Sequence, residues 1–130
     1  MLAASKRDLD KFDAIACGAG VNQIEQRLGD EEAGLGTALQ ARYCDLVVIS
    51  QYSRDGFGPG NRPDFAKYVV LHSVRPVLIV PHDSTGVLDV NVITVAWDGG
   101  AEAVRAITAA LPLLTRAKRV HVAVFDADQG

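Results

Sequence analysis

The stretch Asp45-Leu-Val-Val-Ile-Ser-Gln51 contains an unbroken apolar run from Leu46 to Ile49. A short run of this kind is typical of a strand covered on both faces, as in a parallel sheet between two helix layers. Three more apolar runs follow it along the chain, at Val77–Val80, Val92–Trp97 and Val120–Phe125. The sequence therefore predicts an α/β protein with a parallel sheet.

Segments with helical periodicity lie before and between these runs. The N-terminal helix should end at Gly18 or Gly20, because glycine favours helix ends. Pro112 lies within the last helical pattern and predicts a kink or a break near Leu111. The expected helices are residues 2–17, Asp30–Tyr43 with Asp30 as N-cap, Pro63–His72 with Pro63 in the first turn, and Ala101–Leu114.

Residues 23–28 alternate in polarity. Ile24, Gln26 and Leu28 share one face, and Gln23, Glu25 and Arg27 share the other. A strand with one polar face is typical of the edge of a sheet. We therefore expect an edge strand at this position.

The composition excludes several classes of protein. The chain has 130 residues and a mass of 13.8 kDa, with 48% hydrophobic residues and 22% charged ones, which suits one globular domain. Its net charge of −3 and pI near 5.5 leave no basic excess for binding nucleic acid. No apolar run approaches the roughly 20 residues of a membrane span, and no signal peptide is expected. The two cysteines, Cys17 and Cys44, suit free thiols, so we expect a cytoplasmic protein.

No pattern of catalytic or metal-binding residues stands out. His72, His82 and His121 are far apart and lack the spacing of metal ligands. The glycine-rich segment Gly56–Gly60 does not match a P-loop. Ser50 or Ser53 could be combined with a histidine in a hydrolase, but no nucleophile elbow is present. We therefore expect no catalytic residues and no bound metal.

Several of these stretches together resemble the universal stress protein family. Residues 45–51, the glycine loop, residues 63–70 and residues 73–81 resemble the second half of one such domain. Residues 92–100, with Ala110-Leu-Pro-Leu-Leu114, resemble the first half of the next domain, as in tandem-domain bacterial members. We expect residues 1–81 and 91–130 to be these two halves, joined by a linker at 82–90.

The resemblance implies a three-layer sandwich with a five-stranded parallel sheet of order 3-2-1-4-5. Residues 23–28 would be strand 3, Leu46–Ser50 strand 4, Val77–Val80 strand 5, Val92–Trp97 strand 1 and Val120–Phe125 strand 2. The elements would then occur in permuted order, completing the sheet within one chain or by domain swapping between two. The family also dimerises through strand 5, so the resemblance implies a homodimer interface at Val77, Leu78, Ile79 and Val80.

The resemblance also implies where a ligand would bind. In an open sheet of this order, ligands bind at the carboxyl ends of strands 1 and 4. Family members that bind ATP place an aspartate after strand 1, and Asp98 matches that position. The candidate nucleotide-binding residues are Asp98, Gly99, Gly100, Gln51, Gly56 and Gly58.

The phosphate-binding pattern of the family is only partly matched. Gly56, Gly58 and Gly60 are separated by single residues, and Pro63-Asp64 occupies the place of the family's Gly-Ser or Gly-Thr. Pro63 removes an N–H donor, and Asp64 would repel phosphate. We therefore expect a non-enzymatic stress-response module that acts through oligomer or partner contacts without tight ATP binding. The alternatives are an adenine-nucleotide sensor and, for Asp98, Gly99 and Gly100, a simple strand-to-helix turn.

Overall fold

The computed structural model describes residues 2–56, 58, 60–84, 86 and 88–125. Residues 126–130, which belong to the expected second half, lie outside this part, as do residues 85 and 87 of the expected linker. The chain separates into two compact units, residues 1–31 and residues 32–130, and each is described by itself.

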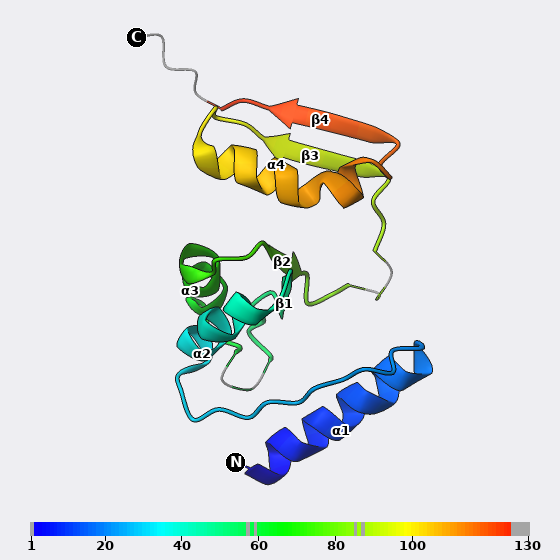
Figure 1. The fold of residues 1–130 in the computed structure, drawn as a ribbon, viewed down its shortest axis with the longest axis vertical. Helices are drawn as coiled ribbons and strands as arrows, with labels where there is room; N and C mark the ends of the chain where they lie inside the picture. Colours follow the sequence, from blue (N-terminus) through cyan, green and yellow to red (C-terminus); the bar gives the residue numbers. More distant parts are fainter. Residues whose placement is uncertain (1, 57, 59, 85, 87, 126–130) are drawn as a thin grey trace. The chain divides into compact units, whose positions relative to one another are not determined.

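The first unit contains helix α1, Leu2–Gly18, and an irregular segment that follows it (Figure 1). The helix ends at Gly18 as expected, and Gly20 adopts a φ of 85° just beyond it. The Val21 N–H donates to the Ala16 carbonyl oxygen at 2.9 Å, which closes the end of the helix. The described residues of this unit therefore form one capped helix with a non-helical return segment.

The edge strand expected at residues 23–28 is wrong, because the structure assigns no strand there. Its polar side chains form local contacts instead. Gln26 Nε2 donates to Asp13 Oδ2 at 2.5 Å, and Arg27 pairs with Glu25 at 2.8 Å. An alternating pattern becomes a strand only where a neighbour supplies ladder hydrogen bonds, and no strand pairs with this segment among the described residues.

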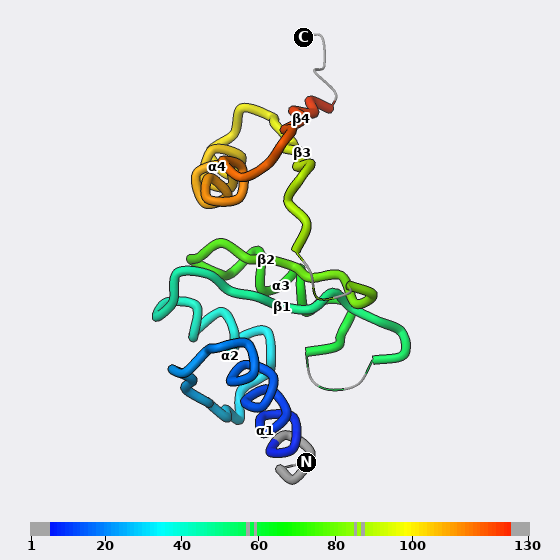
Figure 2. Tube along the Cα trace, turned by 90° about the vertical axis from the view of Figure 1, so that its right-hand side faces the viewer, coloured from blue at the N-terminus to red at the C-terminus, as the bar shows by residue number. Residues whose placement is uncertain are grey.

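The second unit begins with a helix-covered strand pair, here called the α2–β2 part. It comprises α2 (Ala33–Gln40), the short 3-10 helix η1 (Ala41–Tyr43), β1 (Val47–Ser50), α3 (Phe65–His72) and β2 (Val77–Val80). β1 and β2 are parallel, with Val47 beside Val77 and Ser50 beside Val80 (Figure 2). Helices α2 and α3 contact each other, and α3 contacts β2.

Two helix starts differ from expectation. α2 begins after Glu32 rather than Asp30, because the Glu32 side chain accepts a hydrogen bond from the Leu35 N–H at 3.1 Å. α3 begins at Phe65 rather than Pro63. The preceding residues form a tight turn in which the Phe65 N–H donates to the Arg62 carbonyl oxygen at 3.1 Å.

The core of the α2–β2 part lies on one face of β1. Val47 and Ile49 are buried there with Ala41 of η1 and Val69 of α3, which is fully buried. Val48, between the two buried residues, is 58% exposed. The expected cover on both faces of this strand is therefore wrong for the described residues, where one face is covered.

The rest of the second unit, here called the β3–α4–β4 part, is a βαβ motif. Its elements are β3 (Val92–Ala96), α4 (Ala101–Leu114) and β4 (Arg119–Ala123). β3 and β4 are parallel, with Val92 beside Arg119 and Ala96 beside Ala123. The α4 helix contacts β3 and is continuous through Pro112, so of the kink or break expected near Leu111 the break is wrong. Pro112 lies in the last turn, where its missing N–H affects only the end of the helix.

The molecule is thus mixed α/β, and its described strands form two separate two-stranded parallel sheets. Over the described residues, the expected five-stranded sheet between two helix layers is not seen. Over the residues that the structure describes, none of the helices combines the length and hydropathy of a membrane span.

Candidate functional site

An open cleft lies at the carboxyl end of β3, where the chain turns into α4. Its volume is about 340 Å³. It lies at the end of strand β3 that the sequence predicted as a ligand site. The residues that line it are Ala96, Trp97, Asp98, Glu102, Ala103, Ala106 and Phe125.

Asp98 shapes the turn beside this cleft. Its Oδ1 atom accepts a hydrogen bond from the Gly100 N–H at 2.8 Å. Gly99 between them has a φ of 78°, which glycine adopts without steric cost. Gly100 is the N-cap of α4 and offers no side-chain cap. The three residues therefore act together as a strand-to-helix turn, and one Asp98 oxygen is already engaged.

The chemistry of the cleft does not favour phosphate. Its charged side chains, Asp98 and Glu102, are both carboxylates, and among the described residues no lysine or arginine lines it. Carboxylates at the start of a helix stabilise the positive end of its dipole, which is the end that would otherwise attract an anion. Trp97 and Phe125 instead provide aromatic surface, on which a planar ring could stack.

Gln51, Gly56 and Gly58 lie on the loop after β1, and none of them lines this cleft. The Gln51 N–H donates to the Val80 carbonyl oxygen at 2.8 Å and so extends the β1–β2 ladder. The Gly56 N–H donates to the Ser53 carbonyl oxygen at 3.2 Å, and Gly58 has a φ of 103°. The Gly56 amide is therefore used within its own turn.

Asn61 holds the loop closed, a role that the sequence did not indicate. Its Oδ1 accepts from the Ser53 N–H at 2.9 Å, and its Nδ2 donates to the Ser53 carbonyl oxygen at 2.8 Å. A Cβ atom on Gly56 would lie 2.6 Å from Asn61 Nδ2. A side chain at position 56 would therefore push the Asn61 amide away from its two bonds to Ser53, which gives this glycine a structural reason independent of phosphate binding.

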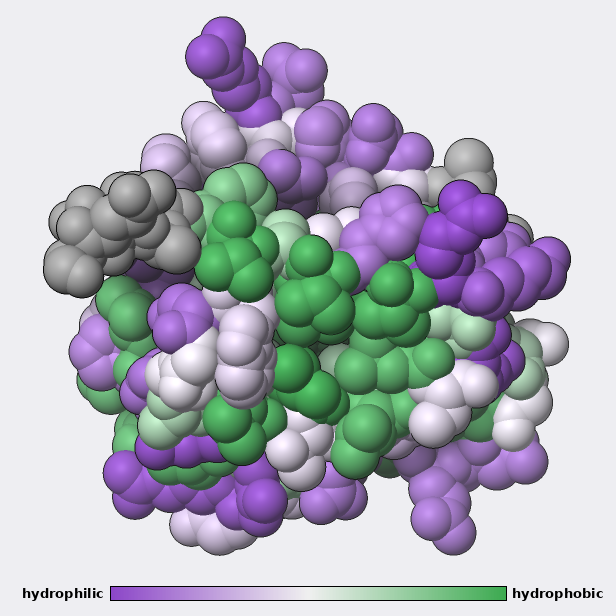
Figure 3. Space-filling view, turned by 90° about the horizontal axis from the view of Figure 1, so that it is seen from above, coloured by the Kyte–Doolittle hydropathy of each residue, from purple (hydrophilic) through white to green (hydrophobic). Residues whose placement is uncertain are grey.

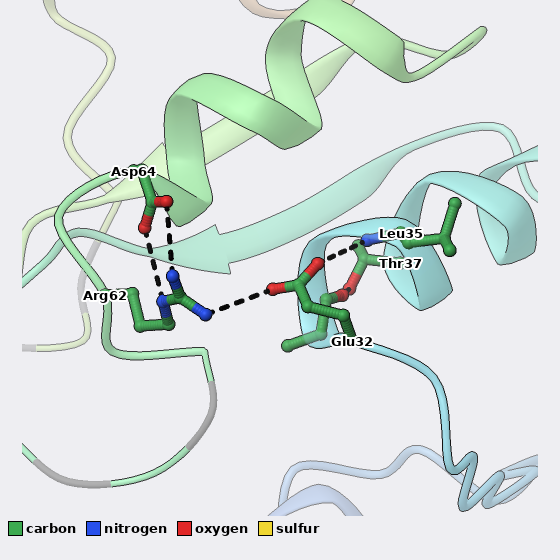
Figure 4. Close-up of polar contacts among 6 residues, drawn as sticks. Glu32, Leu35, Thr37, Arg62 and Asp64 are labelled. Carbon is green, nitrogen blue, oxygen red and sulfur yellow. Dashed lines mark hydrogen bonds and ion pairs between the residues drawn. The ribbon is translucent and has the colours of Figure 1, made fainter.

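Arg62 links the loop to the start of α2 (Figure 4). Its guanidinium lies 3.4 Å from Asp64 and 3.9 Å from Glu32, the residue that caps α2. Asp64 occupies the place of the phosphate-binding residue in the family pattern, and here it pairs with an arginine. All three side chains are more than half exposed, so these ion pairs contribute little to stability.

Two further polar side chains, those of His72 and Thr37, have local roles. His72 Nδ1 lies 2.8 Å from the Tyr68 carbonyl oxygen, and the two rings stack with centroids 4.0 Å apart. Thr37 Oγ1 donates to the Ala33 carbonyl oxygen within α2. Within the part of the chain that the structure describes, no three or more His, Cys, Asp or Glu residues are placed to hold a metal ion.

The interface expected at Val77–Val80 lies on β2, which among the described strands pairs with β1 alone. Ile79 is 41% exposed, while Val77 packs against the core of the α2–β2 part.

No family model, curated protein or solved structure matches the chain.

Proposed function

We propose that this chain is a universal stress protein-like, non-enzymatic stress-response module that acts in the cytoplasm through contacts with other copies or a partner protein. The observation that carries the proposal is the exposure of apolar strands. Val92, Val120 and Val122 are 57%, 42% and 64% exposed, and no residue of the β3–α4–β4 part is buried. Apolar strands of this kind gain stability when another surface covers them.

Both strand pairs are compatible with the sheet order that the resemblance implies. In the order 3-2-1-4-5, strand 4 neighbours strand 5, and strand 1 neighbours strand 2. β1 and β2 correspond to strands 4 and 5, and β3 and β4 to strands 1 and 2. We therefore propose that the pairs join in one sheet, β4-β3-β1-β2, within one chain or by exchange between two. Among the residues that the structure describes, no further strand fills the place of strand 3, beside β4.

The second free edge of this sheet would be β2. Its outward-facing side offers the N–H groups of Val77 and Ile79, since the carbonyl groups of Pro76 and Val80 bond to β1. Homodimer contact through Val77–Val80 would pair these groups with a second copy. A lysine on such an edge blocks pairing because its charge would have to be buried.

Light scattering on Ile79→Lys tests this interface. We expect the assembly to lose mass, because the β2 edges no longer pair. Val70→Lys is the matched control, since Val70 is 49% exposed but lies on helix α3 and not on strand β2. An assembly of unchanged mass in Ile79→Lys would contradict contact through β2.

A second candidate function is an adenine-nucleotide sensor, which the aromatic side chains of Trp97 and Phe125 in the cleft favour. Titration calorimetry with ATP and magnesium separates the two functions. Micromolar binding that is lost in Asp98→Ala would contradict the leading proposal. Asp98→Asn is the control, because an asparagine oxygen can still accept the Gly100 N–H that shapes the turn.

A further inference from the structure

The outer edge of β4 is unpaired, and it has a pattern that suits its own antiparallel copy. β4 pairs with β3 on one side, and among the described residues no strand pairs with the other side. Its large apolar residues and those just after it are exposed: Val120 42%, Val122 64%, Val124 59% and Phe125 78%. Figure 3 shows apolar side chains gathered on the face seen from above, with polar side chains around them.

The backbone hydrogen bonds at the two ends of β4 decide which groups of this strand face the free edge. The Arg119 N–H donates to the Asn91 carbonyl oxygen at 3.0 Å, and the Ala123 carbonyl oxygen accepts from the Trp97 N–H at 2.8 Å. On a parallel strand, alternate residues turn both backbone groups to the same neighbour. Residues 119, 121 and 123 therefore bond toward β3, which leaves Val120, Val122 and Val124 with N–H and C=O groups directed outward.

We propose that β4 pairs with β4 of a second copy in an antiparallel, two-fold symmetric interface centred on Val122. Val122 then lies opposite Val122 of the second copy, and Val120 lies opposite Val124. All outward backbone groups of these three valines find partners, and all three valines meet valines. The inference deepens the proposed function, which holds that the chain acts through contacts with other copies or a partner.

The neighbouring registers fit less well. A centre at His121 places this side chain opposite its own copy and uses fewer of the outward backbone groups. A centre at Val120 requires the Lys118 N–H, which already donates to the Asn91 carbonyl oxygen at 2.9 Å. That register also places Arg119 opposite His121. Centred on Val122, Arg119 lies opposite Phe125, where a guanidinium can contact an aromatic face.

The interface would occupy the position left without a strand. Residues 23–28 were expected beside β4, but the structure assigns no strand to them. The β4 strand of the second copy supplies the missing neighbour, because an isologous interface uses the same surface of both copies. The occupant that competes with it is therefore the 23–28 segment of the same chain.

Two variants of opposite charge test this register. Because Val122 lies opposite its own copy, Val122→Lys and Val122→Glu should each repel themselves but attract each other. We expect the dissociation constant of this contact, measured by sedimentation, to rise at least about tenfold in each variant alone. An equimolar mixture of Val122→Lys and Val122→Glu should bring the dissociation constant back toward the wild-type value. Val70→Lys is again the control, and circular dichroism checks that each variant is folded.

The outcomes separate this inference from the contact at β2. If both edges pair, the mass of the wild-type assembly exceeds that of a dimer. Ile79→Lys and Val122→Lys then each form dimers, and the double variant is a monomer. An assembly unchanged by Val122→Lys overturns β4 pairing, whatever Ile79→Lys does. Loss of mass in Ile79→Lys alone supports the proposed function without it. A folded Val122→Lys monomer with lower stability than a wild-type monomer identifies the 23–28 segment as the occupant and also overturns the inference.

Discussion

The α2–β2 part and the β3–α4–β4 part contain strands of similar composition, but among the described residues only the first part has buried ones. In the first, Val69 is 0% exposed and Ala41 1%, and both pack against β1. In the second, no residue is buried, although Val92, Val95 and Val122 are as apolar as their counterparts. Apolar strand composition is therefore not enough to build a core. The strands also need helices that pack across one face of the sheet.

The number of helices explains much of this difference. α2, η1 and α3 all contribute to the α2–β2 part, and two of them supply buried residues to its core. In the β3–α4–β4 part α4 is the single helix, and it contacts β3. The first part can therefore stabilise itself, whereas the second depends on surfaces outside the motif.

The largest effect should come from placing a charge at Val69. Val69→Asp puts an unpaired carboxylate in the fully buried position of the core, which costs more than about 4 kcal/mol. We expect the α2–β2 part to lose cooperative unfolding in urea, followed by far-ultraviolet circular dichroism. Val70→Asp is the neighbouring control on the same helix. Val70 is 49% exposed, and we expect a change within about 0.5 kcal/mol.

The contrast between the two parts would fail if Val104→Asp were equally damaging. Val104 lies on α4 and is 49% exposed. We expect this change to have a small effect in the dilute monomer, because water already reaches the side chain. A loss of stability as large as that of Val69→Asp would mean that α4 is covered in solution.

A truncation series on β1 should give an intermediate effect. Ile49→Ala removes buried methyl groups next to Val69 and should cost about 3 kcal/mol. Val48→Ala, on the exposed face of the same strand, should change the free energy of unfolding by less than about 0.5 kcal/mol. Equal losses in the two variants would show that both faces of β1 are covered, as the sequence originally predicted.

Much of the secondary structure could be predicted from local sequence patterns. The four apolar runs became β1 to β4 with small shifts at their ends, because a run of β-branched residues favours strands wherever it packs. The failed strand at 23–28 shows the limit of such patterns. Its alternation was genuine, but a strand requires a neighbour, and sequence alone does not reveal which segment comes to lie beside it.

The candidate site was predictable in part for the same reason. The order Trp97-Asp98-Gly99-Gly100 between a strand and a helix indicates a turn at the end of the strand, where the structure has its cleft. The contact between Glu32 and Arg62 left no trace in the sequence, because thirty positions separate two ordinary surface charges. Asn61 was missed because its role depends on how the loop folds back on Ser53.

The smallest effect concerns the way each part begins its helix. Glu32 caps α2 through the Leu35 N–H, whereas Gly100 at the start of α4 gives no side-chain cap. Glu32→Ala should therefore lower the free energy of unfolding by about 1 kcal/mol, because the freed N–H loses its acceptor. Urea titration followed by far-ultraviolet circular dichroism measures the loss of free energy of unfolding.

Two controls separate the cap from the charge of Glu32. Glu32→Gln keeps an oxygen that can accept the Leu35 N–H but removes the ion pair with Arg62, which lies 3.9 Å away. Since an exposed pair at that distance contributes little, this variant should retain most of the stability. Glu31→Ala changes a neighbouring exposed carboxylate that forms no cap and should have almost no effect. If Glu32→Gln instead unfolds as readily as Glu32→Ala, the ion pair with Arg62, and not the cap, stabilises the start of α2.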